Sequence, residues 1–177
     1  QADTIIGGSG GDTIRGSDGN DSITAGAGDE DIDAGNNDDT IVMAGNLTIA
    51  DTIVGGSGDD TLTFTDGDST TTDLNNVSGI ETITLGNAAT NVTTVTGLVT
   101  STNTLTVDGS ALSGGGKTLT FTGSAETNGG KFSITGGDQA DTIIGGSGGD
   151  TIRGSDGNDS ITAGAGDEDI DAGNNDD

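Results

Sequence analysis

The 177-residue sequence contains no cysteine, histidine, proline, tryptophan or tyrosine, and only three phenylalanines and four basic residues. Without cysteine it forms no disulfide and no thiolate metal site. Without histidine, cysteine or tyrosine, catalysis would have to depend on a pair of carboxylates, as in glycosidases. Such sites usually come with aromatic or basic residues that bind the sugar, and these are scarce here. We therefore expect that this chain is not an enzyme.

Long apolar runs are also missing. No run approaches the roughly 18–20 residues of a membrane span, and the first residues lack the basic and then apolar pattern of a signal peptide. Thirty acidic residues against four basic ones give a net charge of -26. Such a surface repels nucleic acid and anionic membranes and attracts cations. We expect no nucleic-acid binding and no membrane insertion, and we expect any secretion signal to lie outside this sequence.

The composition is close to that of disordered chains, with 28% hydrophobic residues and 35 glycines. So little apolar surface is available that a large hydrophobic core cannot offset the chain entropy. Isoleucine, leucine and threonine nevertheless recur at regular spacing. A partner that neutralises carboxylates is therefore the expected source of additional stability.

A nine-residue repeat organises the acidic parts of the chain. Its rows are GGSGGDTIR (7–15), GSDGNDSIT (16–24), AGAGDEDID (25–33), AGNNDDTIV (34–42), the expanded MAGNLTIADTIV (43–54), GGSGDDTLT (55–63) and GGDQADTII (136–144). The sixth place of each row holds an acid and the eighth place holds isoleucine or leucine. The pattern is GGxGxDxUx, where U is a large aliphatic residue.

A second, longer repeat is also present, because residues 1–39 are identical to residues 139–177. The first residue recurs at position 139, and this 138-residue period suggests one unit of a tandem array followed by the start of the next. A recent duplication inside a single domain is the alternative. We predict a calcium-binding roll over 1–63, longer coils over 64–135 and the start of the next unit over 136–177.

The middle segment, 64–135, loses the nine-residue register but keeps strand signals. IETITLG (80–86), NTLTVDG (103–109), KTLTFTG (117–123) and KFSITGG (131–137) alternate apolar residues with threonine or serine and end at glycine. This alternation predicts short strands, and no segment sustains a helical pattern. The predicted core of this segment is Ile80, Ile83, Leu85, Leu105, Val107, Leu119, Phe121, Phe132 and Ile134.

The nine-residue row has a simple physical interpretation. Glycines at places one, two and four allow positive φ and a tight turn. Places seven to nine form a three-residue strand whose middle side chain points inward. Two rows make a coil of about 18 residues, so turns on the same edge come from alternate rows. This arrangement places Asp3, Asp21 and Asp39 in one file of acids, and Asp12 with Glu30 in the opposite file.

Stacked carboxylates require a cation. Coils lie about 4.8 Å apart, and two carboxylates about 5 Å apart repel by roughly 1 kcal/mol even in water. The available ligands are carboxylate and carbonyl oxygens, and a flexible shell of six to eight oxygens suits calcium. Magnesium demands stricter octahedral geometry, and zinc prefers the histidine or cysteine that this chain lacks. The sequence therefore predicts several calcium ions.

Rows such as GGSGGDTIR, GSDGNDSIT and GGSGDDTLT resemble the repeats-in-toxin (RTX) nonapeptide of the calcium-binding parallel β-roll. The resemblance covers residues 1–63 and 136–177 and implies that calcium lies between two turns on the same edge, held by the sixth-place aspartate and turn carbonyls. The implied ligands are Asp3, Asp12, Asp21, Asp39, Asp60, Asp141, Asp150, Asp159 and Asp177, with glutamate replacing aspartate at Glu30 and Glu168.

Three further acids lie outside the regular sixth place of the nine-residue rows. Asp18 and Asp29 lie within turns and can add a ligand. Asp51 follows the different turn of the expanded row, so we do not expect it to ligate in the standard way. The glutamates carry an extra methylene, which can shift or weaken their sites.

These patterns together predict an all-β fold, a right-handed parallel β-solenoid in which RTX coils flank longer, metal-free coils. The middle segment is similar to segments between RTX rows in very long secreted repeat proteins and S-layer-like surface proteins. We expect a structural, calcium-stabilised repeat of an extracellular fibre, surface layer or adhesin stalk that associates with further units or chains. With coils of two rows each, one unit would extend a rod by roughly 35–40 Å.

Two alternatives remain open from the sequence. The chain could be the RTX region of a type I-secreted enzyme or toxin whose catalytic domain lies elsewhere. It could also be a glycan- or ice-binding module, because outward threonines in segments such as TLTFT (61–65) resemble a flat binding face.

Overall fold

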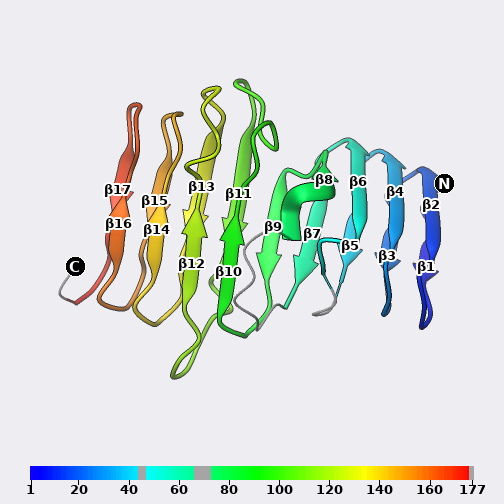
Figure 1. Cartoon of the computed structure of the whole chain (residues 1–177), viewed down its shortest axis with the longest axis horizontal. Coiled ribbons are helices and arrows are strands. Elements are labelled where there is room, and N and C mark those ends of the chain that lie inside the picture. Colours follow the sequence, from blue (N-terminus) through cyan, green and yellow to red (C-terminus); the bar gives the residue numbers. More distant parts are fainter. Residues whose placement is uncertain (44–46, 66–72, 176–177) are drawn as a thin grey trace.

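The computed structural model describes residues 1–43, 47–65 and 73–175, and it is a parallel β-solenoid whose coils stack along the long axis of the molecule (Figure 1). One sheet has nine parallel strands, one from each successive coil. Its strands are β1 (Thr4–Ile6), β3 (Ser22–Thr24), β5 (Thr40–Val42), β7 (Thr61–Phe64), β9 (Thr82–Leu85), β11 (Thr104–Asp108), β13 (Lys131–Thr135), β15 (Thr151–Arg153) and β17 (Asp169–Asp171).

The even-numbered strands form two separate sheets of four parallel strands each. The first contains β2 (Thr13–Asp18), β4 (Asp31–Asn36), β6 (Thr52–Ser57) and β8 (Val77–Ser78), and the second contains β10 (Thr90–Thr93), β12 (Leu119–Thr122), β14 (Thr142–Ile144) and β16 (Ser160–Thr162). A short 3₁₀ helix, η1 (Asp73–Asn76), precedes β8. The described residues contain no α-helix, so the predicted all-β solenoid is confirmed.

The strand register gives the length of each coil. Thr4 pairs with Ser22, so this coil consists of two nine-residue rows. Thr40 pairs with Thr61, a coil lengthened by the expanded row, and Thr104 pairs with Lys131, a coil as long as three rows. Coils of two rows return where Ser133 pairs with Thr151. The RTX rows therefore form the shortest coils, and the middle segment forms longer ones, as expected.

The core is one cluster of apolar side chains between the sheets. Eighth-place residues such as Ile23 and Ile32 are fully buried, and all nine core residues predicted for the middle segment are buried. Phe121 and Phe132 pack edge to face, with ring centroids 5.1 Å apart. Each such side chain contributes about 1.5–3 kcal/mol by leaving water. The long coils add turn residues that the sequence analysis did not include, namely Leu47, Leu74, Val99 and Leu112.

Two sequence-based predictions about the strands were incomplete. The strands β2, β4 and β6 have six residues instead of three. They continue because the following turn keeps its ladder, with Ser17 paired to Gly35 and Gly35 to Gly56. The strand β10 was missed altogether, because its sequence TNVT buries Thr90 beside Val92 and so has only one apolar residue.

The two identical blocks occupy different sheets. Thr4–Ile6 forms β1 of the nine-stranded sheet, but its counterpart Thr142–Ile144 forms β14 of a four-stranded sheet. The counterpart of β2, in turn, is β15 of the nine-stranded sheet. Identical sequence is therefore placed on opposite sides of the solenoid.

Candidate cation-binding turns

The sixth-place acids lie where a turn leads into a strand, and most of them are buried. Burial of an ionised carboxylate is costly unless its oxygens find hydrogen-bond donors or a cation. The exposed fractions are 2% for Asp21, 1% for Glu30, 1% for Asp39, 0% for Asp60, 1% for Asp141, 1% for Asp150 and 7% for Asp159. Asp3 is exposed and Asp12 is half-buried. The acids that the sequence singled out are therefore mainly interior groups.

In the coils after the first, one carboxylate oxygen of each acid accepts a backbone N–H from the preceding coil. The Asp3 N–H donates to Asp21 Oδ1 at 2.7 Å, and the Asp21 N–H donates to Asp39 Oδ1 at 2.7 Å. The Asp39 N–H donates to Asp60 Oδ1 at 2.8 Å. The file continues to Glu81, whose Oε2 accepts the Asp60 N–H at 2.9 Å. The structure thus confirms the predicted file of Asp3, Asp21 and Asp39 and adds Glu81, which has no preceding nonapeptide row to signal it.

The opposite edge carries the same ladder. The Asp12 N–H donates to Glu30 Oε2 at 3.0 Å, and the Glu30 N–H donates to Asp51 Oδ1 at 2.7 Å. Glutamate therefore keeps the ladder hydrogen bond despite its extra methylene. In the second block, the Asp141 N–H donates to Asp159 Oδ1 at 2.8 Å and the Asp150 N–H donates to Glu168 Oε2 at 2.6 Å.

The second carboxylate oxygen divides the acids into two groups. In the first group it is buried without a hydrogen-bond partner, which holds for Asp21 Oδ2, Glu30 Oε1, Asp39 Oδ2, Asp60 Oδ2 and Glu168 Oε1. In the second group it accepts a backbone N–H. Asp12 Oδ2 accepts from Gly8 at 2.6 Å, Asp141 Oδ2 from Gly137 at 2.7 Å, Asp150 Oδ2 from Gly146 at 2.9 Å and Asp51 Oδ2 from Thr48 at 2.6 Å.

The backbone at the second place of the row separates the two groups. It has positive φ before the unpartnered oxygens, with values of 83° at Ser17, 105° at Gly26, 116° at Gly35 and 115° at Gly56. Gly8, Gly137 and Gly146, whose N–H groups do reach the acid, are not among the described residues with positive φ. Positive φ at the second place of the row therefore occurs in the turns whose acid has one carboxylate oxygen without a hydrogen-bond donor. Such an oxygen is suited to a cation.

At Asp21 and Asp60, the glycine at the first place of the row leaves open the space that the unpartnered carboxylate oxygen faces. A Cβ on Gly16 would lie 2.4 Å from Asp21 Oδ2 and 2.2 Å from the Ala34 carbonyl oxygen of the next turn on that edge. A Cβ on Gly55 would lie 2.8 Å from Asp60 Oδ2 and 1.8 Å from the Gly79 carbonyl oxygen. The prediction that this glycine supplies positive φ was wrong, because Gly16 and Gly55 do not have it. Glycine is needed there because oxygens from two turns converge on the site of its missing side chain.

The hard-oxygen donor set fits calcium, which takes carboxylate and backbone carbonyl oxygens in a flexible shell. Within the described residues, no three acidic side chains gather at one point. An ion between two turns would therefore be held by sixth-place carboxylates together with main-chain carbonyls, and the calcium would supply the positive charge that the buried acids lack.

Burial also changes the acidity of these groups. It raises the pKa of Asp60 to about 6, with smaller contributions from the neighbouring charges of Asp39 and Glu81, and the hydrogen bond from the Asp39 N–H partly offsets the rise. Burial likewise raises the pKa of Asp39, Asp141 and Asp150. A raised pKa means that the charged form is destabilised, so a cation bound here would stabilise the fold.

The remaining predicted ligands lie differently. Asp18 is exposed, and its Oδ1 accepts from Asn36 Nδ2 at 2.8 Å. The Asp29 side chain is also exposed, although its carbonyl oxygen lies 2.6 Å from the position that a Cβ on Gly11 would take. Asp177 lies outside the described residues. Ligation by any of these acids remains a prediction.

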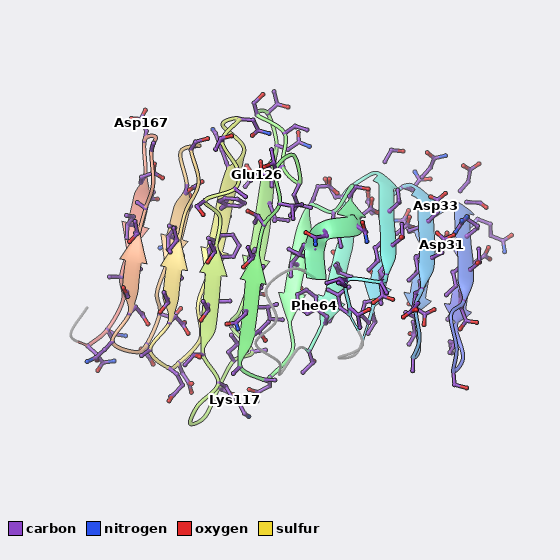
Figure 2. All side chains as sticks on the ribbon, viewed as in Figure 1. Asp31, Asp33, Phe64, Lys117, Glu126 and Asp167 are labelled. Atoms are coloured by element: carbon purple, nitrogen blue, oxygen red, sulfur yellow. The ribbon has the colours of Figure 1, made fainter. Side chains whose placement is uncertain are left out.

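Glu126 is a buried acid that the sequence analysis missed. It lies in the segment that connects β12 to β13 in the chain (labelled in Figure 2) and is 1% exposed. Its Oε1 accepts from the Val99 N–H at 3.1 Å and its Oε2 from the Gly97 N–H at 3.3 Å. Both oxygens are therefore satisfied by a turn of the preceding coil, and no periodic signal marks this position because the long coils do not repeat.

The model of the RTX calcium-binding nonapeptide repeat, in four copies, matches residues 2–41, 50–70, 133–152 and 144–177. No curated protein and no solved structure gives a significant match. A search of the described residues found no helix with the length and apolar character needed to span a membrane. The family matches cover more than half of the sequence and coincide with the ladders of buried acids. This chain therefore belongs to the family of RTX calcium-binding nonapeptide repeats.

Proposed function

We propose that this chain is a structural module that calcium holds in its folded state. RTX repeats imply calcium binding, and one observation supports this role most directly. Buried carboxylate oxygens of Asp21, Asp39 and Asp60 have no hydrogen-bond donor, and at Asp21 and Asp60 such an oxygen faces a carbonyl oxygen of a neighbouring turn.

The ion-binding residues would be the predicted sixth-place acids together with turn carbonyls. Asp21, Glu30, Asp39, Asp60 and Glu168 carry the unpartnered oxygens. The first acids after the long coils, Asp141 and Asp150, already accept two backbone N–H groups each, from Leu119 and Gly137 and from Phe132 and Gly146. They form the transition from metal-free coils to calcium-dependent ones.

Calcium would act as a folding switch. An ion that binds only the native state stabilises it by mass action, so the fraction folded depends on the free calcium concentration. At low calcium, as in a cytoplasm, the acid ladders repel and the RTX coils stay expanded. At the millimolar calcium typical of extracellular fluid, the coils fold.

The setting that fits these properties is a long extracellular protein, and RTX repeats are typically found in secreted proteins. The identity of residues 1–39 and 139–177 supports a tandem array with this period. We propose that such an array forms a fibre, a surface layer or an adhesin stalk, with 1–63 as a β-roll, 64–135 as longer coils and 136–177 as the next unit's start. Its role would be mechanical and non-catalytic.

Circular dichroism during calcium titration tests this function. The chain is first freed of calcium with EGTA, and the β-sheet signal is then followed as calcium is added. We expect a large, cooperative gain of β structure with calcium and a much smaller one with magnesium at equal ionic strength. A chain that is fully β-structured in EGTA and does not respond to calcium would contradict the proposal.

A further inference from the structure

The repeating unit contains an odd number of half-coils, where a half-coil is the step from a strand on one side of the solenoid to the next strand on the other side. The chain alternates between the nine-stranded sheet and the four-stranded sheets at every step from β1 to β17. From β1 (Thr4–Ile6) to its counterpart β14 (Thr142–Ile144) it takes thirteen steps, and a complete coil takes two. The unit therefore spans six and a half coils, and its second copy begins on the opposite side of the solenoid.

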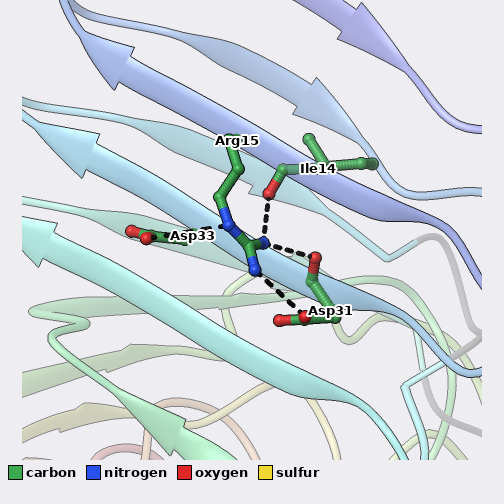
Figure 3. A network of polar contacts seen from close by, with 4 residues as sticks. All are labelled: Ile14, Arg15, Asp31 and Asp33. Carbon is green, nitrogen blue, oxygen red and sulfur yellow. Dashed lines mark hydrogen bonds and ion pairs between the residues drawn. The ribbon is translucent and has the colours of Figure 1, made fainter.

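The two blocks repeat an arginine–aspartate ion pair on opposite sides of the solenoid. Arg15 of β2 forms ion pairs with Asp31 at 3.0 Å and with Asp33 at 3.9 Å, both on β4 (Figure 3). The counterpart of Arg15, Arg153 of β15, pairs with Asp171 of β17 at 3.3 Å. The first set lies on a four-stranded sheet and the second on the nine-stranded sheet.

The hollows beside these arginines are also duplicated. One has a volume of about 410 Å³ and is lined by Arg15, Ser17, Asp18, Asp33, Gly35 and Asn36. The other has a volume of about 400 Å³ and is lined by the six counterparts, from Arg153 to Asn174. The backbone agrees as well, since φ is 83° at Ser17 and 85° at Ser155. The two blocks therefore have the same local structure but lie on opposite faces of the solenoid.

The two four-stranded sheets are separated by a break in strand pairing, but strand pairing is continuous on the opposite side of the solenoid. β8 and β10 do not belong to one sheet. Across from them, β7 pairs with β9 and β9 pairs with β11 without interruption. A unit of whole coils would place every such discontinuity on one face of an array.

We propose that consecutive copies of this unit are rotated by half a turn about the solenoid axis, so that an array presents the same surface on both faces. The proposal depends on the proposed function, because it requires a tandem array. Sheet discontinuities then alternate between faces, and each is spanned by an unbroken sheet opposite. The hollow beside Arg15 and its counterpart beside Arg153 then lie on opposite faces of the array. A neighbouring copy of the chain can therefore contact the same surface on either face.

The half-turn also sets the axial repeat. Six and a half coils at about 4.8 Å give roughly 31 Å per unit and roughly 62 Å for the true repeat of two units. This unit length is shorter than the value expected from uniform two-row coils. The reason is that the longer coils, such as those that join Thr40 to Thr61 and Thr104 to Lys131, use more chain for the same rise.

Engineered disulfides test the half-turn in the present chain, whose lack of cysteine removes any background. In the structure Thr120 of β12 pairs with Thr142 of β14, and Ser133 of β13 pairs with Thr151 of β15. Neighbouring strands are about 4.8 Å apart, within the usual Cα separation of a disulfide. We expect Thr120→Cys with Thr142→Cys, and Ser133→Cys with Thr151→Cys, to form intramolecular disulfides detectable by mass spectrometry.

Ser133→Cys with Thr142→Cys is the matched control, because these residues become neighbours only if the second block continues on the face of β13. We expect no disulfide from it in variants whose circular dichroism with calcium equals that of the parent chain. A disulfide in this control would overturn the proposal. So would the absence of a disulfide from both expected pairs when the variants are folded. The disulfides are measured in the folded chain, so their pattern does not depend on whether folding requires calcium.

Electron microscopy tests the same geometry in an array. Consecutive copies that each carry Thr13→Cys are labelled with gold particles. We expect the labels to alternate between the two sides, with roughly 62 Å between labels on one side. Labels on a single side at half that spacing would overturn the half-turn. A parent protein with only one unit would contradict the array and the proposed fibre, surface layer or stalk, but it would leave the disulfide result unchanged.

Discussion

Some acids of the RTX coils are buried in a different way from Glu126 of the middle coils. Asp39 and Asp60 in the RTX coils are buried with one oxygen that lacks a donor. Glu126 in the middle coils is equally buried, but both of its oxygens accept backbone N–H groups. The first arrangement leaves an oxygen that a cation can bind, and the second is satisfied by backbone N–H groups alone.

The apolar contributions differ in the same direction. An RTX coil of two rows buries the eighth-place aliphatic residues and small residues such as Ala25 and Ala34. The longer coils add Phe121, Phe132 and turn residues such as Val99 to the core. Because stabilisation by burial increases with apolar area, we expect the middle coils to retain more stability than the RTX coils when calcium is removed.

Calcium removal should give the largest separation between the two regions. Hydrogen exchange measured by mass spectrometry in EGTA should show loss of protection in β2 to β5 and β14 to β17, because their buried carboxylates then repel without compensation. Amides of β11 to β13 should exchange last. Equal loss of protection in both regions would contradict the distinction.

The largest single-residue effect should come from the middle core. Phe121→Ala removes a fully buried ring that packs on Phe132. We expect the free energy of unfolding in calcium to fall by about 3–5 kcal/mol. Urea denaturation measures this loss. The calcium concentration that half-saturates the RTX coils should stay nearly unchanged. A parallel loss of calcium affinity would argue against separate stabilisation of the RTX coils and the middle coils.

Asp39→Asn should act on the RTX coils in the reverse manner. The amide removes the charge of a carboxylate whose Oδ2 has no partner, so we expect weaker calcium binding and a loss of about 1–3 kcal/mol in calcium. Without calcium, the variant should be no less stable than the parent chain, because one repulsive charge is gone.

Asp38→Asn is the matched control, since it makes the same charge change at the adjacent, exposed residue. Isothermal titration calorimetry should find unchanged calcium stoichiometry for this control and a lower one for Asp39→Asn. Identical titration curves for the two variants would exclude Asp39 as a ligand.

Glu126→Gln tests the ion-independent arrangement. The glutamine side chain keeps one acceptor, so one of the N–H groups of Gly97 and Val99 loses its partner and the free energy of unfolding should fall by about 1–2 kcal/mol. Thermal unfolding should show the same loss with and without calcium. A loss confined to calcium-containing samples would mean that Glu126 binds the ion.

The smallest expected effect is that of pH on the calcium-free chain. The pKa of Asp60 is about 6, above the ordinary value of 3.8, so the folded state binds this proton more tightly than the unfolded state does. Stability without calcium should therefore be greatest below about pH 4 and should decline as the pH rises through 6. With saturating calcium, which binds the carboxylate form, acidification should instead weaken folding.

Thermal melts from pH 4 to pH 7.5, with and without calcium, measure these opposite slopes. The same slope in both conditions would contradict the role of the buried acids.

Much of this molecule could be predicted from the sequence because its rows repeat. A sixth-place acid such as Asp21 and an eighth-place aliphatic residue such as Ile23 recur at a spacing that alone determines the coil, the inward side chain and the file of acids. Hard-oxygen ligands and the absence of histidine and cysteine indicate calcium in the same way. In the middle segment, alternation was sufficient to identify β9, β11, β12 and β13.

The remaining features depend on how coils stack and could not be derived from periodicity. Which carboxylate oxygens lack a donor depends on the φ angle of residues such as Ser17 and Gly35, and GGSGGDTIR does not reveal that Gly8 donates to Asp12. Glu126 meets Gly97 and Val99 only because a long turn folds back against the preceding coil.

The repeating strand and turn, the expected calcium chemistry and the membership of the RTX family follow from local spacing and side-chain type. The face on which each block lies is known only from the folded solenoid. That outcome depends on the total number of half-coils between the blocks, to which the irregular middle coils contribute without a recognisable period. Two identical sequences therefore have the same turns but lie on opposite sides of the solenoid.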